Sequence, residues 1–187
     1  MDSVESPNQL KTKKTVVKIR EMTIDDLALV FHMGEKLFLA EHAPNTYRAW
    51  DEYEVTDLFY SDTEFCLVAE YEEQTIGFAL GTTISKPRSA WKYGYLTWLG
   101  VLPEFQRKGV ADKLFQRFKS LMLQANVRIL VVDTEADNAK ALNFFAEQGF
   151  GHPQEHIYLS MNLDQERQRM SRKKKPNGSQ QRFFKIP

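Results

Sequence analysis

The 187-residue sequence predicts an α/β or α+β fold, with a central sheet that carries helices on both faces. β-Branched and aromatic runs alternate with segments of helical period, in the order strand, helices, strands, helix, strand, helix, strand. Apolar residues recur at steps of three and four from 111 to 125, as on a helix that packs on a sheet. The continuous apolar run Ile129–Val132 follows, as in a strand buried within a parallel or mixed sheet.

The first third of the chain contains one expected strand and two expected helices. Residues 1–14 are polar and without period, so we expect a loose N-terminal arm. Thr15–Arg20 is a short β-branched run, which predicts the first strand. Thr23 is a good N-cap for the helix that follows, and this helix is expected to end near Pro44. Residues 50–60 predict a second, shorter helix.

The middle of the chain predicts a hairpin followed by a third strand. Phe65–Tyr71 and Thr75–Ser85 flank a tight polar connection, and Tyr93–Val101 is the next apolar strand. The later elements are a helix over 111–125, a strand over 129–132, a helix over 139–148 that Gly149 closes, and a last strand over Ile157–Leu163.

The charge is divided unevenly along the chain. The net charge is zero, but residues 164–187 hold eight Lys and Arg against two acidic residues, a net +6. Residues 1–163 therefore carry −6, which does not suggest nucleic-acid binding by the folded part. We expect one domain over 15–163 and a basic, disordered tail over 164–187. The alternative for the tail is an electrostatic contact with RNA, ribosomes or acidic proteins.

The cysteine and histidine content and the hydropathy of the chain limit which cellular compartment and which metal cofactors are expected. Cys66, the single cysteine, lies in an apolar run, so we expect a buried side chain in a reducing compartment. No apolar run approaches the roughly 20 residues that span a bilayer, and residues 1–14 lack the apolar segment of a secretory signal. We therefore expect a cytoplasmic protein without membrane contact. The four histidines show no metal-ligand spacing with Cys66, so no metal is expected.

The strongest chemical signal is the turn between the strand ending at Val101 and the next helix. The first turn of a helix has N–H groups without intrahelical partners and a positive dipole end, so it attracts phosphate. Gly109 lets the backbone approach an anion closely, and Arg107 and Lys108 add charge that suits a pyrophosphate. The plainer interpretation is an ordinary strand-to-helix turn with a solvated basic pair.

Two segments of the chain resemble a known family. V-L-P-E-F-Q-R-K-G-V-A at 101–111 resembles the acetyl-CoA signature of the GNAT superfamily of N-acetyltransferases. N-A-K-A-L-N-F-F-A-E-Q-G-F at 138–150 resembles a second segment of that superfamily, at the expected distance. The resemblance covers roughly residues 15–163. It implies the GNAT fold, a central mixed, mostly antiparallel sheet with a splayed strand pair at the acetyl-CoA site.

The resemblance implies where acetyl-CoA binds as a co-substrate. The backbone of Leu99, Gly100 and Val101 would receive the pantetheine and the acetyl group. Asn138 would contact the cofactor through its side-chain amide, and Ala111 stands where the family more often has a second glycine. The pyrophosphate would be held by backbone N–H groups of Gln106, Arg107, Lys108, Gly109, Val110 and Ala111.

The resemblance also implies direct attack of a primary amine on the thioester, which needs a base for the ammonium and an N–H near Val101 for the oxyanion. Tyr95 lies on the strand leading to this site, where relatives carry a catalytic tyrosine or glutamate. Asp133 ends the next strand, where N-terminal acetyltransferases show His or Glu. The plainer interpretations are a packed aromatic for Tyr95 and a turn or cap residue for Asp133. Glu135 and, as a substitute acid, Tyr158 are weaker choices.

Phe145 departs from the family's pattern. A tyrosine at this position often protonates the leaving thiolate, and phenylalanine has no proton to give. The departure keeps two functions open, an N-acetyltransferase and a non-catalytic acyl-CoA-binding or adaptor module on the same fold. Turnover discriminates the two, since both predict cofactor binding.

The acceptor amine stays open between a small amine, a lysine side chain and a protein N-terminus, and the oligomeric state is open too. The short connection after Phe150 disfavours a strict N-terminal acetyltransferase. The aromatic residues between the first helices could line the acceptor side, but we expect them to belong to the core. They are Tyr47, Trp50, Tyr53 and Tyr60.

Overall fold

The chain divides into two compact units, Met1–Phe144 and Phe145–Pro187. The boundary lies inside a helix, whereas the sequence predicts one domain over 15–163. The first unit contains the sheet, and the second contains the end of that helix and one further helix. The computed structural model describes residues 16–38, 50–85, 88, 91–154, 157, 159, 161 and 163–173.

The first unit is built on a five-stranded sheet in the order β1-β2-β3-β4-β5. The strands from β1 to β4 pair antiparallel, and β5 pairs parallel with β4. This confirms the predicted mixed, mostly antiparallel sheet. The strands are β1 (Lys18–Glu21), β2 (Cys66–Tyr71), β3 (Gln74–Ser85), β4 (Lys92–Val101) and β5 (Ile129–Val131).

The two edges of β4 differ, and this difference positions the site. β5 pairs with β4 only at residues 93–95, so the segment Leu96–Val101 continues without β5 beside it. On the other edge, β3 pairs along the whole of β4, with a register shift between Leu80 and Gly81 that leaves Thr97 as an extra residue. A bulge of this kind bends a strand and re-aims its side chains. The described part of β4 is therefore splayed from β5 over its second half.

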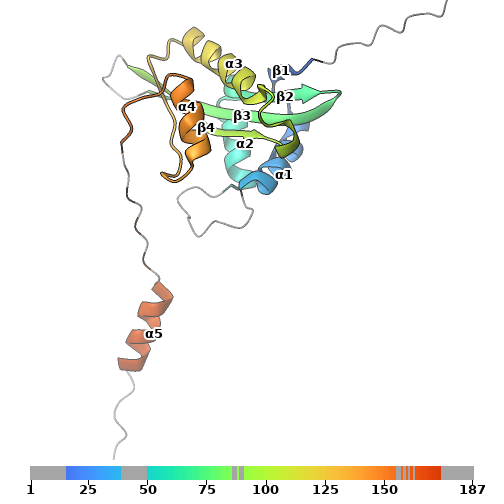
Figure 1. Ribbon diagram of the computed structural model, residues 1–187. Helices are drawn as coiled ribbons and strands as arrows, with labels where there is room; N and C mark the ends of the chain where they lie inside the picture. Colours follow the sequence, from blue (N-terminus) through green and yellow to red (C-terminus); the bar gives the residue numbers. More distant parts are fainter. Residues whose placement is uncertain are drawn as a thin grey trace, which may run out of the picture. The chain divides into compact units, whose positions relative to one another are not determined.

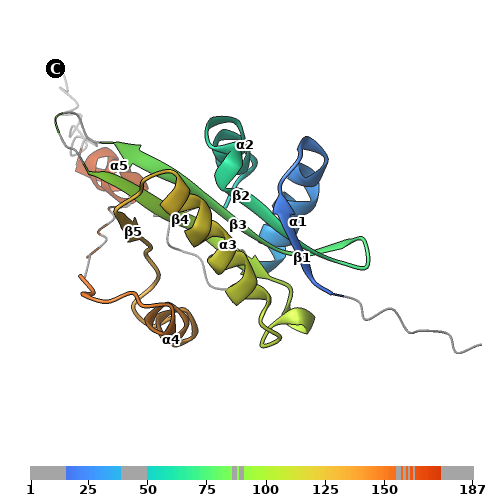
Figure 2. The ribbon, with the colours of Figure 1, turned by 90° about the horizontal axis from the view of Figure 1, so that it is seen from above.

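One face of the sheet is covered by α3 (Val110–Gln124), which crosses β3 and β4 (Figures 1 and 2). Its buried side chains include Leu114, Phe118 and Met122, which confirms the apolar stripe expected over 111–125. The sheet makes room for this helix at Gly81, because a Cβ there would lie 2.5 Å from the Phe118 ring.

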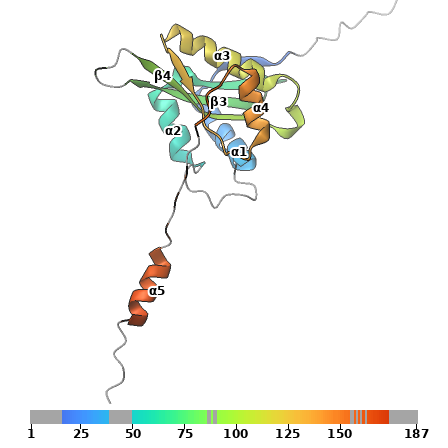
Figure 3. The same cartoon turned by 60° about the vertical axis from the view of Figure 1, so that its left-hand side comes forward.

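The opposite face of the sheet is covered by α1 (Leu27–Phe38) and α2 (Glu52–Ser61), as Figure 3 shows for α2. The expected helix end near Pro44 lies outside the described residues. Cys66 is fully buried, as predicted, and this burial raises the pKa of its thiol to about 12. The core on this face contains Met22, Val30, Met33, Trp50, Val55, Cys66, Val68, Phe78 and Leu80.

The second unit begins within α4 (Ala139–Glu147) and contains α5 (Leu163–Lys173). Gly149 has a φ of 93°, the left-handed conformation that ends a helix, as predicted. The Phe145 and Phe150 rings pack edge to face at 5.3 Å, and the Phe150 N–H donates to the Phe145 carbonyl.

The last part of the chain differs from the expectation. Residues 157, 159 and 161 are not in a strand, and Leu163 begins α5 rather than ending a strand. The alternation of apolar residues suits a strand, but the described apolar side chains of this segment are all exposed, so no burial supports pairing. α5 occupies a segment expected to be disordered, and the ion pairs Arg167–Asp164 and Arg169–Glu166 support it from within. No helix of the described residues is long and apolar enough to cross a bilayer.

Candidate functional site

The turn that leads from β4 into α3 has an unusual backbone. Gly109 has a φ of 75° and Arg107 a φ of 57°, so two left-handed residues stand within three positions of each other. A Cβ at Gly109 would contact nothing within 4 Å, so the glycine serves the backbone conformation rather than close packing. α3 begins directly at Val110, and the Lys113 N–H makes the first intrahelical bond, to the Gly109 carbonyl.

The side chains of this turn are exposed and partly anchored. The short helix Pro103–Phe105 precedes the turn, and the Gln106 side chain donates from Nε2 to the Val101 carbonyl at 3.0 Å. The Lys108 ammonium lies 5.4 Å from the Phe105 ring centroid. Arg107 and Lys108 are exposed, so a positively charged turn faces solvent at the N-terminus of α3. This arrangement suits a phosphate group.

The expected pantetheine segment lies on the open half of β4. Leu99, Gly100 and Val101 pair with Ala79, Phe78 and Gly77 of β3, and none of the three pairs with β5. Backbone N–H and C=O groups alternate in direction along a strand, so this stretch presents groups on the edge that β5 leaves open.

Tyr95 and Asp133, the two candidate bases, contact each other. Tyr95 is the last β4 residue that pairs with β5, and Asp133 lies just after β5 ends at Val131. The Tyr95 hydroxyl donates to Oδ1 of Asp133, and both residues are half-buried. The parallel register of β4 and β5 therefore brings together the two residues that the sequence offered as alternative bases.

Asn138 caps a helix in this structure. Its side-chain Oδ1 accepts the Ala141 N–H at 3.2 Å, and its Nδ2 donates to the Thr134 hydroxyl at 3.2 Å. Asn138 is exposed and stands directly before α4. Of the weaker candidates, Glu135 is exposed and Tyr158 lies outside the described residues.

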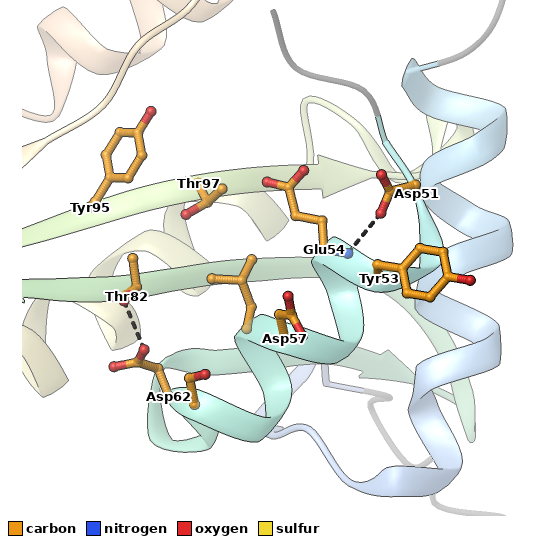
Figure 4. Close-up of a pocket in the computed structure, with 10 residues that line it drawn as sticks. Asp51, Tyr53, Glu54, Asp57, Asp62, Thr82, Tyr95 and Thr97 are labelled. Carbon is orange, nitrogen blue, oxygen red and sulfur yellow. Dashed lines mark hydrogen bonds between the residues drawn. The ribbon is translucent and has the colours of Figure 1, made fainter.

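A pocket of about 520 Å³ opens beside Tyr95, between α2 and the strands β3 and β4 (Figure 4). Tyr95, Thr97 and Thr82 contribute its strand side. Among the described residues that line it, none is basic and four are acidic. The four are Asp51, Glu54, Asp57 and Asp62.

Three of the pocket carboxylates are held by a hydrogen bond. Glu54 accepts from the Trp98 indole N–H at 2.9 Å, and Asp62 accepts from the Thr82 hydroxyl at 2.7 Å. Asp51 is the N-cap of α2 and accepts the Glu54 N–H at 2.8 Å. These contacts fix the positions of the negative charges.

The predicted site residues do not include the carboxylates of this pocket, although the sequence contains a signal for them. Asp51, Glu54 and Asp57 recur at steps of three, which places them on one side of the start of a helix. Which neighbour that side faces depends on how α2 packs on the sheet, and the spacing does not reveal it.

The aromatic residues between the first helices do not behave alike. Trp50 is in the core with 4% of its surface exposed, as predicted, and its indole N–H donates to the Phe31 carbonyl. Tyr53 and Tyr60 are 73% and 89% exposed, so the prediction of core positions is wrong for them. Tyr53 instead lines the pocket beside Tyr95, whereas Tyr60 lies on the solvent side of α2, whose buried side is centred on Val55. Tyr47 lies outside the described residues.

The described residues contain no group of three or more His, Cys, Asp or Glu side chains that could hold a metal ion. The pocket carboxylates are therefore spread along the walls rather than gathered around one point.

Three comparisons place the chain among known proteins. N-alpha-acetyltransferase 30 of Schizosaccharomyces pombe is 30% identical over 94 residues, which is 46% of this chain and 57% of the relative. The chain thus spans little more than half the length of this curated relative. The aminoglycoside N-acetyltransferase AAC(6')-Iy, solved with CoA, superposes with a TM-score of 0.64 at 18% identity, over 81% of this chain and 99% of that one.

The Naa50 structure of Arabidopsis thaliana, solved with a bisubstrate analogue, superposes with a TM-score of 0.59 at 19% identity, over 74% of this chain and 85% of that one. At such identities the two structures show a shared fold. Residues 35–150, more than half of the chain, match the family described as the acetyltransferase (GNAT) family. This match spans α2, the whole of the strand pair that splays and the turn into α3, and on it the chain belongs to the GNAT acetyltransferase family.

Proposed function

We propose that the chain is an acetyl-CoA-dependent N-acetyltransferase that transfers an acetyl group to a primary amine by direct attack. The observation that carries the proposal is the Tyr95–Asp133 hydrogen bond, which lies where β5 leaves β4 and beside an open pocket. Family membership supports the reaction class. A cytoplasmic location stays part of the proposal, on the ground of the lone reduced cysteine.

The residues of the turn fit a CoA pyrophosphate. The left-handed backbone at Arg107 and Gly109, the exposed cations and the first-turn N–H groups of α3 all favour an anion. We propose that the backbone of residues 106–111 binds the pyrophosphate and that the open edge at 99–101 binds the pantetheine. Asn138 would have to exchange its cap bonds to contact the cofactor, so it is the weakest member of the proposed set.

The Tyr95–Asp133 pair can manage the proton of the reaction. Acetyl-CoA supplies an activated acetyl group, and the acceptor must reach it as a neutral amine. Asp133 is a carboxylate that can take a proton from the ammonium, through Tyr95 or through a water. Because the Tyr95 hydroxyl already donates to this carboxylate, it can also release its proton to the leaving thiolate and recover one from Asp133. The pair would thus fill the role that Phe145 leaves vacant.

The test is acetyl-CoA consumption, measured as free thiol release, against a panel of small amines, lysine peptides and N-terminal peptides. Wild type is compared with Tyr95→Phe and Asp133→Asn, with acetyl-CoA binding measured by calorimetry in each. We expect turnover with one acceptor class and a loss of about 10²-fold or more in both variants at nearly unchanged acetyl-CoA affinity. Variants that keep full turnover would remove Tyr95 and Asp133 from the mechanism.

A non-catalytic acyl-CoA-binding module is the second candidate, and the Phe145 side chain is the observation that favours it. This candidate predicts acetyl-CoA binding without thiol release for every acceptor class in the panel. Absence of acetyl-CoA binding would contradict both candidates.

A further inference from the structure

The acidic pocket beside Tyr95, lined by Asp51, Glu54, Asp57 and Asp62, bears on which amine the chain accepts. Carboxylates gathered around one hollow repel one another, and none of the described lining residues offers a positive charge to offset this. A local conflict of this kind is expected where a site is shaped for a ligand rather than for stability. A cationic ligand would supply the positive charge that these residues lack.

A second observation ties this charge to the reaction. Tyr95 both lines the pocket and donates to Asp133, so the pocket borders a residue of the proposed reaction. Across the sheet, Tyr95 pairs directly with Thr82, and the Thr82 hydroxyl donates to Asp62 at 2.7 Å. Thr82 thus connects the strand position beside Tyr95 to the carboxylate at the C-terminal end of α2.

The remaining carboxylates extend the negative surface along α2. Figure 4 shows Glu54 and Asp57 extending from α2 toward the two strands, with Tyr95 and Thr97 opposite. The Trp98 N–H holds Glu54 in this direction at 2.9 Å. An acceptor whose amine reaches Tyr95 therefore has carboxylates beside the rest of its length.

We infer that the acceptor is a small aliphatic di- or polyamine, whose reacting amine lies at Tyr95 while its remaining ammonium charge is bound by the carboxylates along the pocket wall, Asp62, Asp57 and Glu54. The pocket volume of about 520 Å³ is in the range of small-molecule sites, which fits a small acceptor. The inference rests on the proposed acetyl transfer for its reaction and on the pocket alone for its binding.

The sharpest test compares putrescine with butylamine, which has the same carbon chain and lacks the second amine. With wild type, we expect kcat/KM for putrescine to exceed that for butylamine by about tenfold or more, the effect of one charge-assisted contact. Asp62→Asn, Asp57→Asn and Glu54→Gln should each lower this ratio, mainly by raising KM for putrescine.

Each substitution keeps the shape of its side chain. The amide oxygens introduced by Asp62→Asn and Glu54→Gln can still accept the bonds from Thr82 and Trp98. Glu52→Gln is the matched control, because Glu52 lies on the same helix but lines a separate hollow against α1. This control removes one negative charge from α2 without touching the pocket, so the putrescine preference should persist in it.

Calorimetry of putrescine against butylamine, with wild type and Asp62→Asn, separates this inference from the proposed function. Putrescine binding that Asp62→Asn abolishes would support the pocket even if no amine is acetylated. Equal kcat/KM for the two amines, with acetylation intact, would overturn the diamine inference and leave the N-acetyltransferase. A lysine-rich peptide that outcompetes putrescine and responds to the same substitutions would overturn the choice of a small acceptor.

Discussion

At the residue scale, a network of ion pairs and hydrogen bonds around Asp26 lies away from the site. This carboxylate is 3% exposed and accepts both terminal nitrogens of Arg20, at 2.7 and 2.9 Å. It also accepts the Thr23 N–H and hydroxyl, and Arg20 bonds Glu70 on β2. Thr23 thus caps the short helix Ile24–Asp26 that leads into α1, through a reciprocal contact with Asp26.

This cluster predicts a specific dependence of stability on pH. The Arg20 guanidinium holds the pKa of Asp26 at about 2, below its usual value. A carboxyl with a lowered folded-state pKa stabilises the protein above its unfolded pKa of roughly 4, and this stability is lost as the pH falls toward 2. We expect Asp26→Asn to lower the free energy of unfolding by about 1–3 kcal/mol at pH 7 and by much less near pH 2.

Urea unfolding of wild type and Asp26→Asn across this pH range measures the effect. Asp25→Asn is the matched control, since Asp25 is the exposed neighbour on the same short helix. Equal losses in the two variants, or a loss in Asp26→Asn that does not change with pH, would contradict the role of the Arg20 pair.

At the element scale, the periodic segments were predictable and the contacts between them were not. Apolar steps of three and four, and β-branched runs, located α3, α4 and the strands β2–β5 because local sequence decides these patterns. The Tyr95–Asp133 contact depends on the register of β5 beside β4, and the acidic pocket depends on the face that α2 turns to the sheet. Both are long-range properties that one sequence does not encode in any short pattern.

The final strand expected over Ile157–Leu163 shows that a local pattern can also predict an element that the described residues do not form. Its alternation satisfies the period of a strand, but the exposed fractions of Ile157 and Leu159 are 85% and 84%. Period alone is insufficient, because a strand is stabilised by side-chain packing on its neighbours.

The turn before α3 allows a prediction that separates backbone strain from binding. Gly109→Ala places a side chain on a backbone with a φ of 75°, where it meets no atom, so its cost is conformational and about 1 kcal/mol. We expect this substitution also to weaken acetyl-CoA binding, because a strained turn relaxes away from the conformation that holds a pyrophosphate. Thermal unfolding and calorimetry with acetyl-CoA measure the two effects.

Gly149→Ala is the matched control for this turn. Gly149 has a φ of 93° and equally open space around its Cα, but it ends α4 instead of beginning α3. It should lose similar stability and keep its acetyl-CoA affinity. If both variants bind acetyl-CoA as wild type does, the turn does not hold the cofactor.

At the scale of the whole molecule, the division of charge has consequences for both the tail and the site. Residues 1–163 carry −6 and residues 164–187 carry +6, so the acidic pocket and the basic segment belong to a chain with no net charge. We propose a contact of the basic segment with RNA, ribosomes or acidic proteins as a separate role, for which the charge is the only support. Opposite charges within one chain also lower the field that a cationic acceptor meets at a distance.

Removal of residues 164–187 tests these consequences together. The described apolar side chains of α5, Leu163 and Met170, are 60% and 65% exposed, so the change in the free energy of unfolding should stay within about 0.5 kcal/mol. Retention on nucleic acid at low salt should be lost, and kcat/KM for putrescine should rise, since the remaining chain carries −6. The gain should vanish at about 0.3 M salt, where charges are screened within roughly 6 Å. Unchanged nucleic-acid retention would end the proposal for the tail, and a fall in kcat/KM at unchanged stability would mean that the basic segment assists the acceptor site.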